Sequence, residues 1–439
     1  MRKLLCLLAL LTLVLVWSPA GAAAAPGYFG VPQGGRAPVL HRVYDQFLTD
    51  AGAPLASPRT CEPGPGGPAT INDAQNLFSI AGGRLVKGTG AARAKITFGS
   101  YPRTPGLIFL GSYIKPTGSA RSMDYSGWYN ADAGTISAYE LAINQSSASR
   151  WLGVGWSATV GPVITTALTD DVEYNFALPL GSVGGQVFVK GGTEYPNWTL
   201  LYVVKTGSAD PVYPGYQAYN TDVGSYGFVD VPWVRWLAAP AAYATFDDAF
   251  AVTEGYAGDG GLGAGGGGLT WTTQLGTIVS SGGSIHATAL GGTGSDRAIA
   301  TVPVTSAYNL IYATLTKGTT GCGLVTHYTD ADNYHYCWHN GTNLITVERL
   351  AGVETTKITA AAAYSAGAWA NLVATNSSTQ RAYYNQTQLV GTASTFNTGL
   401  LAPNVGVIFF DTDSTIGQFE AYERGNEGQY DAYLGRFFQ

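Results

Sequence analysis

The stretch that decides the fold is Thr316–Thr342, TKGTTGCGLVTHYTDADNYHYCWHNGT. Its pattern predicts two strands, Gly321–Tyr328 and Tyr334–His339, joined by a turn over Thr329–Asn333. Aspartate and asparagine favour such turns because they hydrogen-bond their own backbone and tolerate left-handed conformations. A polar turn between aromatic and β-branched runs therefore predicts a β-hairpin.

Similar strand-length segments recur on both sides of this hairpin, and no segment shows helical apolar spacing. The only alanine-rich candidate for a helix, Ala360–Ala363, is cut short by Ser365-Ala366-Gly367. Many short strands with frequent turn signals predict an all-β sandwich. The expected strands are Leu107–Ile114, Tyr174–Leu178, Gln186–Lys190, Thr199–Val204, Leu310–Leu315, Asn371–Ala374 and Gln380–Tyr384.

The chain repeats itself at an offset of about 200 residues, which indicates a tandem domain duplication rather than a solenoid. Ser79–Leu85 matches Val279–Ile285, with a Gly-Gly pair in register that predicts a hairpin turn at positive φ. We expect two domains, residues 44–238 and 239–424, with an alanine-rich junction at Ala238–Thr245.

The N-terminus has the features of a secretory signal peptide over residues 1–25. Arg2 and Lys3 precede the apolar run Leu4–Val16, and small residues follow. The run is short for a membrane span of ~20 residues, although a retained anchor is the alternative. We expect a secreted protein, extracellular or at the cell surface and without membrane insertion. Residues 26–43 are expected to form a flexible leader, and residues 425–439 an aromatic tail that needs burial.

The low, net negative charge of the chain argues against two classes of partner. Charged residues are only 12% of the chain, and without Arg2 and Lys3 the 21 remaining basic residues face 29 acidic ones. Nucleic acids and anionic membranes both require basic patches, so we expect neither as a partner. A weakly charged, glycine- and tyrosine-rich chain is typical of an extracellular β protein.

Residues 245–424 contain the motifs Gly323-Leu324-Val325, Tyr328, Asp330, Asn333-Tyr334, Gly367-Ala368-Trp369 and the Asn385-Gln386 turn. These motifs resemble those of the laminin-G-like and concanavalin A-like lectin/glucanase superfamily. Residues 44–238 resemble the family less closely, through the shared repeats and Gly191–Trp198. The resemblance implies two tandem concanavalin A-like jelly-roll β-sandwiches, with any ligand on a concave face or in rim loops.

The sequence offers no recognisable catalytic motif. The glucanases of this superfamily carry a Glu-x-Asp-x-x-Glu strand that pairs two carboxylates for retaining hydrolysis, and the chain lacks it. The nearest acidic groups, Asp170–Glu173 and Glu420–Glu423, have other spacings and fit solvated turns or strand edges. We therefore expect a protein that is not an enzyme.

The hairpin cysteines allow two interpretations. Cys322 and Cys337 stand at similar distances from the turn, so a disulfide would close a loop of about 15 residues and contribute ~3 kcal/mol. Alternatively His335, Cys337 and His339 share one strand face and would bind zinc. Cys61 is left over, either as a buried thiol or as a link between chains.

Three aromatic groups are candidate platforms for sugar rings, although core packing is the usual role of tryptophan in a sandwich. They are Tyr125/Trp128/Tyr129, Tyr195/Trp198 and Tyr334/Tyr336/Trp338. The third group shares a strand face opposite His335, Cys337 and His339, so one of these two faces must be the core.

Cofactors are not expected, and calcium is considered besides zinc. Asp330, Asp332 and Asn333 would supply oxygen ligands, but a calcium site needs about 6–8 oxygens, so a plain turn is the favoured interpretation of these residues.

Taken together, the sequence predicts a secreted, non-enzymatic pair of lectin-like modules that bind a polysaccharide or cell-surface glycan or act in adhesion. The first alternative is a structural subunit that assembles with copies of itself into an extracellular fibre, sheath or surface layer. The second is a divergent glycoside hydrolase whose carboxylates are paired only in space.

Overall fold

The structure is a computed structural model, and its regular structure in the described residues is all strand. None of these residues belongs to a helix long and apolar enough to cross a membrane. The described residues are 40–58, 70–73, 75–88, 93–101, 107–114, 123–129, 137–146, 149–156, 159–165, 169–180, 185–204, 212–219, 225–233, 246–248, 270–281, 283–292, 296–304, 307, 309–374, 380–385, 387–388, 396–397 and 399–423.

The first sandwich consists of two antiparallel sheets. One has the strand order β13-β12-β11-β6-β15-β4-β3, with β1 also paired to β15, and the other has the order β10-β9-β8-β7-β14-β5-β2. The strands are β1 Leu40–Asp45, β2 Ile71–Asp73, β3 Phe78–Ala81, β4 Arg84–Lys87, β5 Arg93–Phe98, β6 Ile108–Ile114, β7 Met123–Tyr129, β8 Ser137–Ser146, β9 Ser149–Trp156, β10 Thr159–Thr165, β11 Glu173–Pro179, β12 Gly185–Gly191, β13 Tyr195–Val204, β14 Tyr213–Tyr219 and β15 Ser225–Trp233.

The second sandwich repeats this plan. Its first sheet, which we call the back sheet, has the strand order β18-β19-β30-β21-β26-β27-β28, with β16 paired to β30. Its second sheet, which we call the front sheet, has the strand order β17-β20-β29-β22-β23-β24-β25. The strands are β16 Phe246–Asp248, β17 Thr272–Leu275, β18 Thr277–Ser281, β19 Ser284–Ala289, β20 Ala298–Pro303, β21 Asn309–Thr316, β22 Cys322–Asp330, β23 Asn333–His339, β24 Asn343–Leu350, β25 Val353–Ala361, β26 Ala368–Ala374, β27 Gln380–Tyr384, β28 Thr387–Gln388, β29 Asn404–Phe409 and β30 Thr415–Glu423.

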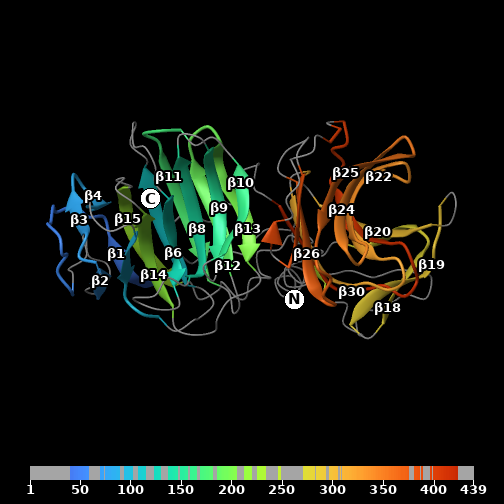
Figure 1. The fold of residues 1–439 in the computed structure, drawn as a ribbon, viewed down its shortest axis with the longest axis horizontal. Helices are drawn as coiled ribbons and strands as arrows, with labels where there is room; N and C mark the ends of the chain where they lie inside the picture. The colour runs from blue at the N-terminus through green and yellow to red at the C-terminus, as the bar shows by residue number, and fades with distance from the viewer. Residues whose placement is uncertain are drawn as a thin grey trace, which may run out of the picture.

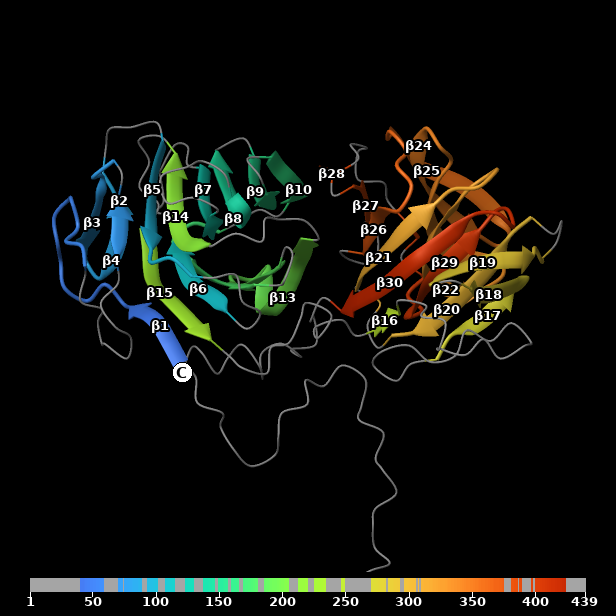
Figure 2. The same cartoon turned by 90° about the horizontal axis from the view of Figure 1, so that it is seen from below.

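The two sandwiches have the same topology. Each described strand of the first, β1 to β15, has a counterpart fifteen strands later that pairs with the corresponding neighbours. Figures 1 and 2 show the two sandwiches side by side, with β10 and β13 of the first nearest to the second. This agreement explains the repeat in the sequence and confirms the predicted all-β jelly-roll fold.

The glycine repeat marks equivalent hairpins. Gly82 and Gly83 turn the chain between β3 and β4 at φ of 59° and 72°, and Gly283 has φ of 78° between β18 and β19. A side chain at positive φ is strained, whereas glycine adopts this region freely. The repeated Gly-Gly pairs therefore identify the same turn in both halves.

The expected strands are present, with ends that differ by a few residues, and Gln380–Tyr384 is β27 as predicted. Two details were wrong. The hairpin turn is shorter than expected, because β22 extends to Asp330 and β23 begins at Asn333. The end of the expected leader, residues 40–43, belongs to β1, because an extended segment there pairs with the backbone of β15.

Other predictions lie outside the described residues. These are the signal peptide, the rest of the leader, the junction at 238–245, Cys61 and the tail at 425–439.

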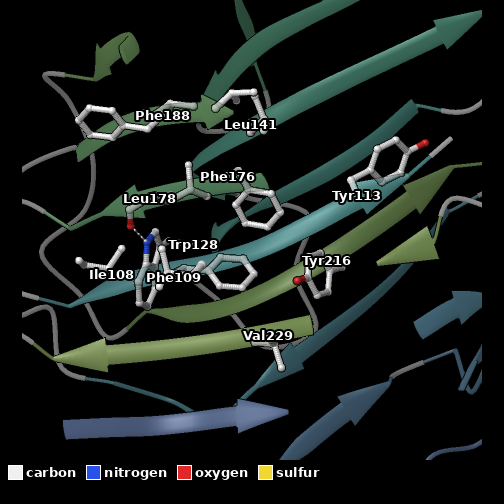
Figure 3. Close-up of a cluster of buried hydrophobic side chains, with 14 of the residues drawn as sticks. Ile108, Phe109, Tyr113, Trp128, Leu141, Phe176, Leu178, Phe188, Tyr216 and Val229 are labelled. Carbon is white, nitrogen blue, oxygen red and sulfur yellow. Dashed lines mark hydrogen bonds between the residues drawn. The ribbon is translucent and has the colours of Figure 1, made fainter. Parts of the chain in front are cut away.

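Each sandwich is filled by apolar side chains from the facing sides of its sheets. In the first, Phe109, Phe176 and Tyr216 pack with ring centroids 5.3–6.1 Å apart (Figure 3). In the second, Trp271 packs against Phe419 at 5.1 Å. Burial of such large rings is the main stabilising term in each half.

A tyrosine cluster joins the two sandwiches. Tyr202 of β13 packs against Tyr312 and Tyr383 of the back sheet, with ring centroids 6.0 and 5.5 Å apart. The backbone N–H of Val203 donates a buried hydrogen bond of 3.0 Å to the Tyr312 hydroxyl. Because β13 is an edge strand, this hydroxyl satisfies an edge donor that would otherwise lose its water partner.

We expect Tyr312→Phe to lower the free energy of unfolding by about 1–3 kcal/mol, because the buried Val203 N–H loses its acceptor. Urea unfolding followed by tryptophan fluorescence measures the change. Tyr213→Phe, at a half-buried position on β14, is the control and should change stability by less than about 0.5 kcal/mol. Equal stability of the two variants would contradict this account of the interface.

Candidate functional site

Strand β23 presents two different faces, as its alternation requires. Its register pairs Val325 with Tyr336 and Leu324 with Cys337. Leu324 and Cys337 belong to the core between the sheets, whereas Val325 and Tyr336 belong to a separate apolar cluster on the opposite, outer face of the front sheet. The histidine and cysteine face is therefore the core, and the tyrosine and tryptophan face points away from it.

The outer face of the front sheet carries a continuous line of rings, which we call the aromatic row. Successive ring centroids lie 5.5 Å apart for Tyr328 and Tyr334, 5.8 Å for Tyr334 and Tyr336, 5.6 Å for Tyr336 and Phe410, and 4.7 Å for Phe410 and Trp338. Three strands contribute to it, because Phe410 directly follows β29. The row includes all of the third predicted platform.

Exposure changes along the aromatic row. Tyr328, Tyr334 and Tyr336 are buried, and Trp338 and Phe410 are half-buried. Burial raises the pKa of Tyr328 to about 12 and also raises the pKa of Tyr334 and Tyr336, so these hydroxyls stay protonated at neutral pH. The accessible part of the row is therefore its Trp338–Phe410 end.

Arg297 organises the charges beside the row. Its guanidinium donates hydrogen bonds to the Tyr334 hydroxyl at 2.8 Å and to both carboxylate oxygens of Asp296 at 2.9 and 2.5 Å, and it forms an ion pair with Glu354. It also lies 5.7 Å from the centre of the Phe410 ring. The hydrogen bonds from Arg297 lower the pKa of Asp296. The Asp296 carboxyl is thus held ionised, and Arg297 pairs with both Asp296 and Glu354.

The calcium candidates Asp330, Asp332 and Asn333 form hydrogen bonds and an ion pair around the hairpin turn. One carboxylate oxygen of Asp330 accepts hydrogen bonds of 2.8 Å from both the Asp332 N–H and the Asn333 side chain. Asp332 pairs with Arg349 at 3.2 Å. Within the described residues, no group of three or more histidine, cysteine, aspartate or glutamate side chains could hold a metal ion. The turn interpretation explains these three residues.

The first platform is divided between two faces. Trp128 cannot serve as a sugar platform, because it lies fully buried in the core, where its indole N–H donates to the Leu178 carbonyl at 2.8 Å (Figure 3). Tyr129 points to the other side of β7, where the Lys95 ammonium lies 4.9 Å from its ring centre, and is also buried. The side chain of Tyr125 lies outside the described residues.

The second candidate platform, Tyr195 and Trp198, is also buried and does not form an exposed surface. Tyr195 and Trp198 are 5% and 1% exposed and belong to the core cluster of the first sandwich. They lie on β13, the edge strand against which the second sandwich packs. The spacing of two aromatic residues along a strand is the same whether their rings are buried or exposed. Only the packing of the sandwiches shows that these two rings are buried.

The predicted disulfide is absent, since Cys322 and Cys337 are both free and buried. Cys322 lies opposite His339 and Cys337 lies opposite Leu324, so the cysteines are diagonal neighbours. Diagonal side chains across a ladder are about 7–8 Å apart, whereas a disulfide needs Cβ atoms within about 4.5 Å. The distances from the turn are unequal, because Cys322 lies eight residues before Asp330 at the end of β22 and Cys337 lies four residues after Asn333 at the start of β23.

The zinc alternative also fails for the residues first considered. His335, Cys337 and His339 do share the inner face, but they are successive positions along one strand and do not converge. His339 Nδ1 accepts a hydrogen bond of 2.9 Å from Gly341 N–H.

Burial lowers the pKa of His327 to about 4 and that of His335 to about 3, so both rings are neutral at pH 7.

Sequence reasoning missed Arg297, Glu354 and Phe410, which complete the site. None stands in a motif, and Arg297 and Glu354 are 57 residues apart. Alternation in the segment Val405–Phe410 was a usable signal, because it predicts a strand with Phe410 and Phe409 on opposite faces.

Comparison with protein-family models and with curated proteins gives no match. Solved structures with a similar fold include the carbohydrate-binding module CBM66 from Bacillus subtilis, at 11% identity over 35% of this chain and 92% of that one, with a TM-score of 0.27. The VIP36 exoplasmic/lumenal domain in its Ca2+/Man3GlcNAc-bound form is 9% identical over 38% and 84%, with a TM-score of 0.29. A β-1,3-glucanase from Mycobacterium marinum is 13% identical over 45% and 100%, with a TM-score of 0.29.

We expect alkylating reagents to leave Cys322 and Cys337 unmodified in the folded protein, because burial raises the pKa of both thiols and removes the reactive thiolate. Both should react once guanidinium unfolds the chain without reductant. Mass mapping of the modified peptides measures this. A disulfide would instead keep both positions unlabelled until a reductant is added.

Proposed function

We propose that this is a secreted, non-enzymatic glycan-binding protein whose second sandwich binds a sugar ring at the Trp338–Phe410 end of the aromatic row. The observation that carries the proposal is the position of these two rings. They are half-buried, 4.7 Å apart, and lie at the end of a line of buried aromatic side chains. Rigid aromatic side chains supply a large contact area at little entropic cost, which suits them to ligand stacking.

The polar groups beside the rings fit a glycan. A pyranose has one apolar face for stacking and equatorial hydroxyls that need hydrogen-bond partners. Glu354, whose side chain is 35% exposed, supplies an acceptor, and the buried Arg297 beside Phe410 holds this carboxylate in place. Since Asp296, Glu354 and Asp332 offset Arg297 and Arg349 within these ion pairs, the site has no excess positive charge and favours neutral over anionic sugars.

The same ion pairs argue for binding rather than hydrolysis. Retaining hydrolysis needs two carboxyl groups about 5–5.5 Å apart, one of them protonated at working pH. Asp296 and Glu354 are both bound by Arg297, and the pKa of Asp296 is lowered. A carboxyl held ionised in this way is a poor general acid.

Trp338→Ala should weaken binding to neutral polysaccharides by at least about tenfold, which is the loss expected when a central aromatic anchor is truncated. Affinity electrophoresis against glucan, mannan and xylan panels, followed by calorimetry, measures the change. Trp338→Phe keeps a stacking ring and should retain most of the affinity. Leu401→Ala, at an exposed position that is not part of the aromatic row, is the control. The proposal fails if Trp338→Ala binds as tightly as the unmodified chain.

Assembly into an extracellular fibre, sheath or surface layer is a second candidate, favoured by strand β25. This nine-residue edge strand of the front sheet is largely exposed, and Val353 is 66% exposed. An exposed edge offers unpaired backbone groups to another chain.

If β25 mediates assembly, Val353→Lys should abolish higher-order species, because a charge on an edge strand blocks strand pairing. Sedimentation velocity and negative-stain images at increasing concentration measure this, with Leu401→Lys as the matched control. A chain that stays monomeric at every concentration would exclude this candidate.

A further inference from the structure

A polar cluster lies inside the second sandwich, on the inner face of the front sheet. His327 of β22 and His335 of β23 are fully buried there, and Gln380 at the start of β27 reaches them from the back sheet. The cluster therefore spans the two sheets. It is separate from the aromatic row, which occupies the outer face.

Three polar groups of this cluster converge on one point. The Nδ1 atoms of His327 and His335 are 3.2 Å apart. The side-chain amide nitrogen of Gln380 lies 3.0 Å from His327 Nδ1 and 2.5 Å from His335 Nδ1.

The far side of each ring fixes which nitrogen carries the proton. His327 Nε2 lies 2.9 Å from the Ala307 carbonyl, which can only accept, so Nε2 is the N–H. His335 Nε2 makes no hydrogen bond to a described residue, but it lies 3.4 Å from a carboxylate oxygen of Glu348, whose negative charge favours a proton on Nε2. In the neutral rings both Nδ1 atoms then carry lone pairs, and these two buried nitrogens lie 3.2 Å apart.

Glu348 is itself held in place. Its other oxygen pairs with the Lys357 ammonium at 2.8 Å, and the Asn397 N–H donates to Oε2 at 2.5 Å. Metal-binding histidines commonly present their second nitrogen to a carboxylate or a backbone carbonyl in this way, which orients the ring and sets its tautomer.

The backbone is strained to bring His327 into this cluster. Alternation along β22 would direct His327 outward, since Thr326 pairs with the inward-facing His335. The register shifts after Thr326, and His327 adopts φ of 53° in the left-handed region. Such conformations cost free energy and are concentrated at functional positions.

Hydrogen bonding alone leaves the cluster incompletely satisfied. If the Gln380 amide nitrogen donates to both Nδ1 atoms, its Oε1 remains buried without a partner, as does Thr326 Oγ1. Unpartnered buried polar atoms are rare in folded proteins and call for an explanation such as an ion.

We propose that His327 Nδ1, His335 Nδ1 and the side-chain amide oxygen of Gln380 bind a single transition-metal ion of the Zn2+ class. A 180° rotation of the amide presents Oε1 in place of the nitrogen. Two nitrogens bound at about 2.0–2.1 Å to a tetrahedral ion lie about 3.3 Å apart, which matches the 3.2 Å between the two Nδ1 atoms. Imidazole ligands suit Zn2+, Cu2+ and Ni2+ better than Ca2+ or Mg2+.

The ion has a structural role in this proposal, because it links β27 of the back sheet to β22 and β23 of the front sheet. Metal binding to the folded chain then adds directly to stability.

The test uses the full chain without a histidine tag, stripped with EDTA and kept reduced. We expect it to bind one Zn2+ per chain by elemental analysis, and its Tm to rise with Zn2+ concentration. His335→Ala should lose the bound ion. Glu348→Gln, which removes the carboxylate charge beside His335 and touches none of the three proposed ligands' binding atoms, should weaken Zn2+ affinity by about 10–100-fold. His339→Asn, at another buried histidine of the same face, should still bind one ion.

Gln380→Glu separates the two interpretations even if His335→Ala fails to fold. A carboxylate at this position should tighten Zn2+ binding. If Gln380 serves only as a hydrogen-bond donor, the variant loses stability at every Zn2+ concentration. A stripped chain that holds no stoichiometric Zn2+ and has a Tm independent of added Zn2+ would overturn the proposal.

Discussion

The alternation of side chains along β23 is the constraint on which the second sandwich depends. Because successive residues point to opposite faces, Tyr334, Tyr336 and Trp338 stand on one side of the front sheet and His335, Cys337 and His339 on the other. A shift of one residue in the pairing of β22 and β23 would exchange these two sets. The same register therefore places the rings that we propose as the glycan site and the imidazoles that we propose as the metal site.

The contact between the sandwiches solves a different problem. Strand β13 ends a sheet, so the Tyr202 ring and the Val203 N–H would lose their cover if the first sandwich stood alone. The back sheet of the second sandwich covers them with Tyr312 and Tyr383, and the Tyr312 hydroxyl takes the hydrogen bond of Val203 N–H. The duplicated halves are thus unequal partners, because one contributes a strand edge and the other contributes a sheet face.

The two sandwiches share one topology, but their tryptophan side chains lie on different faces. In the first sandwich Trp128 and Trp198 are committed to the core, and Trp128 is held there by its hydrogen bond to Leu178. In the second, Trp338 stands on the outer face of the front sheet beside Phe410, with its ring half-exposed. A shared fold sets where strands run, and the residues on each face set what that surface can bind.

The sequence by itself determined the all-β class, the duplication and most strand positions, because alternation, Gly-Gly turns and a repeat offset are local or periodic signals. It also showed that one face of β23 had to be core. Tertiary structure decided which face that was, since burial depends on the opposing sheet. The diagonal placement of Cys322 and Cys337 depends on the register between β22 and β23. The contacts of Arg297 with Glu354 and of His327 with Gln380 join strands that are far apart in the chain. Such contacts depend on how sheets pack in space, which no local pattern of residues encodes.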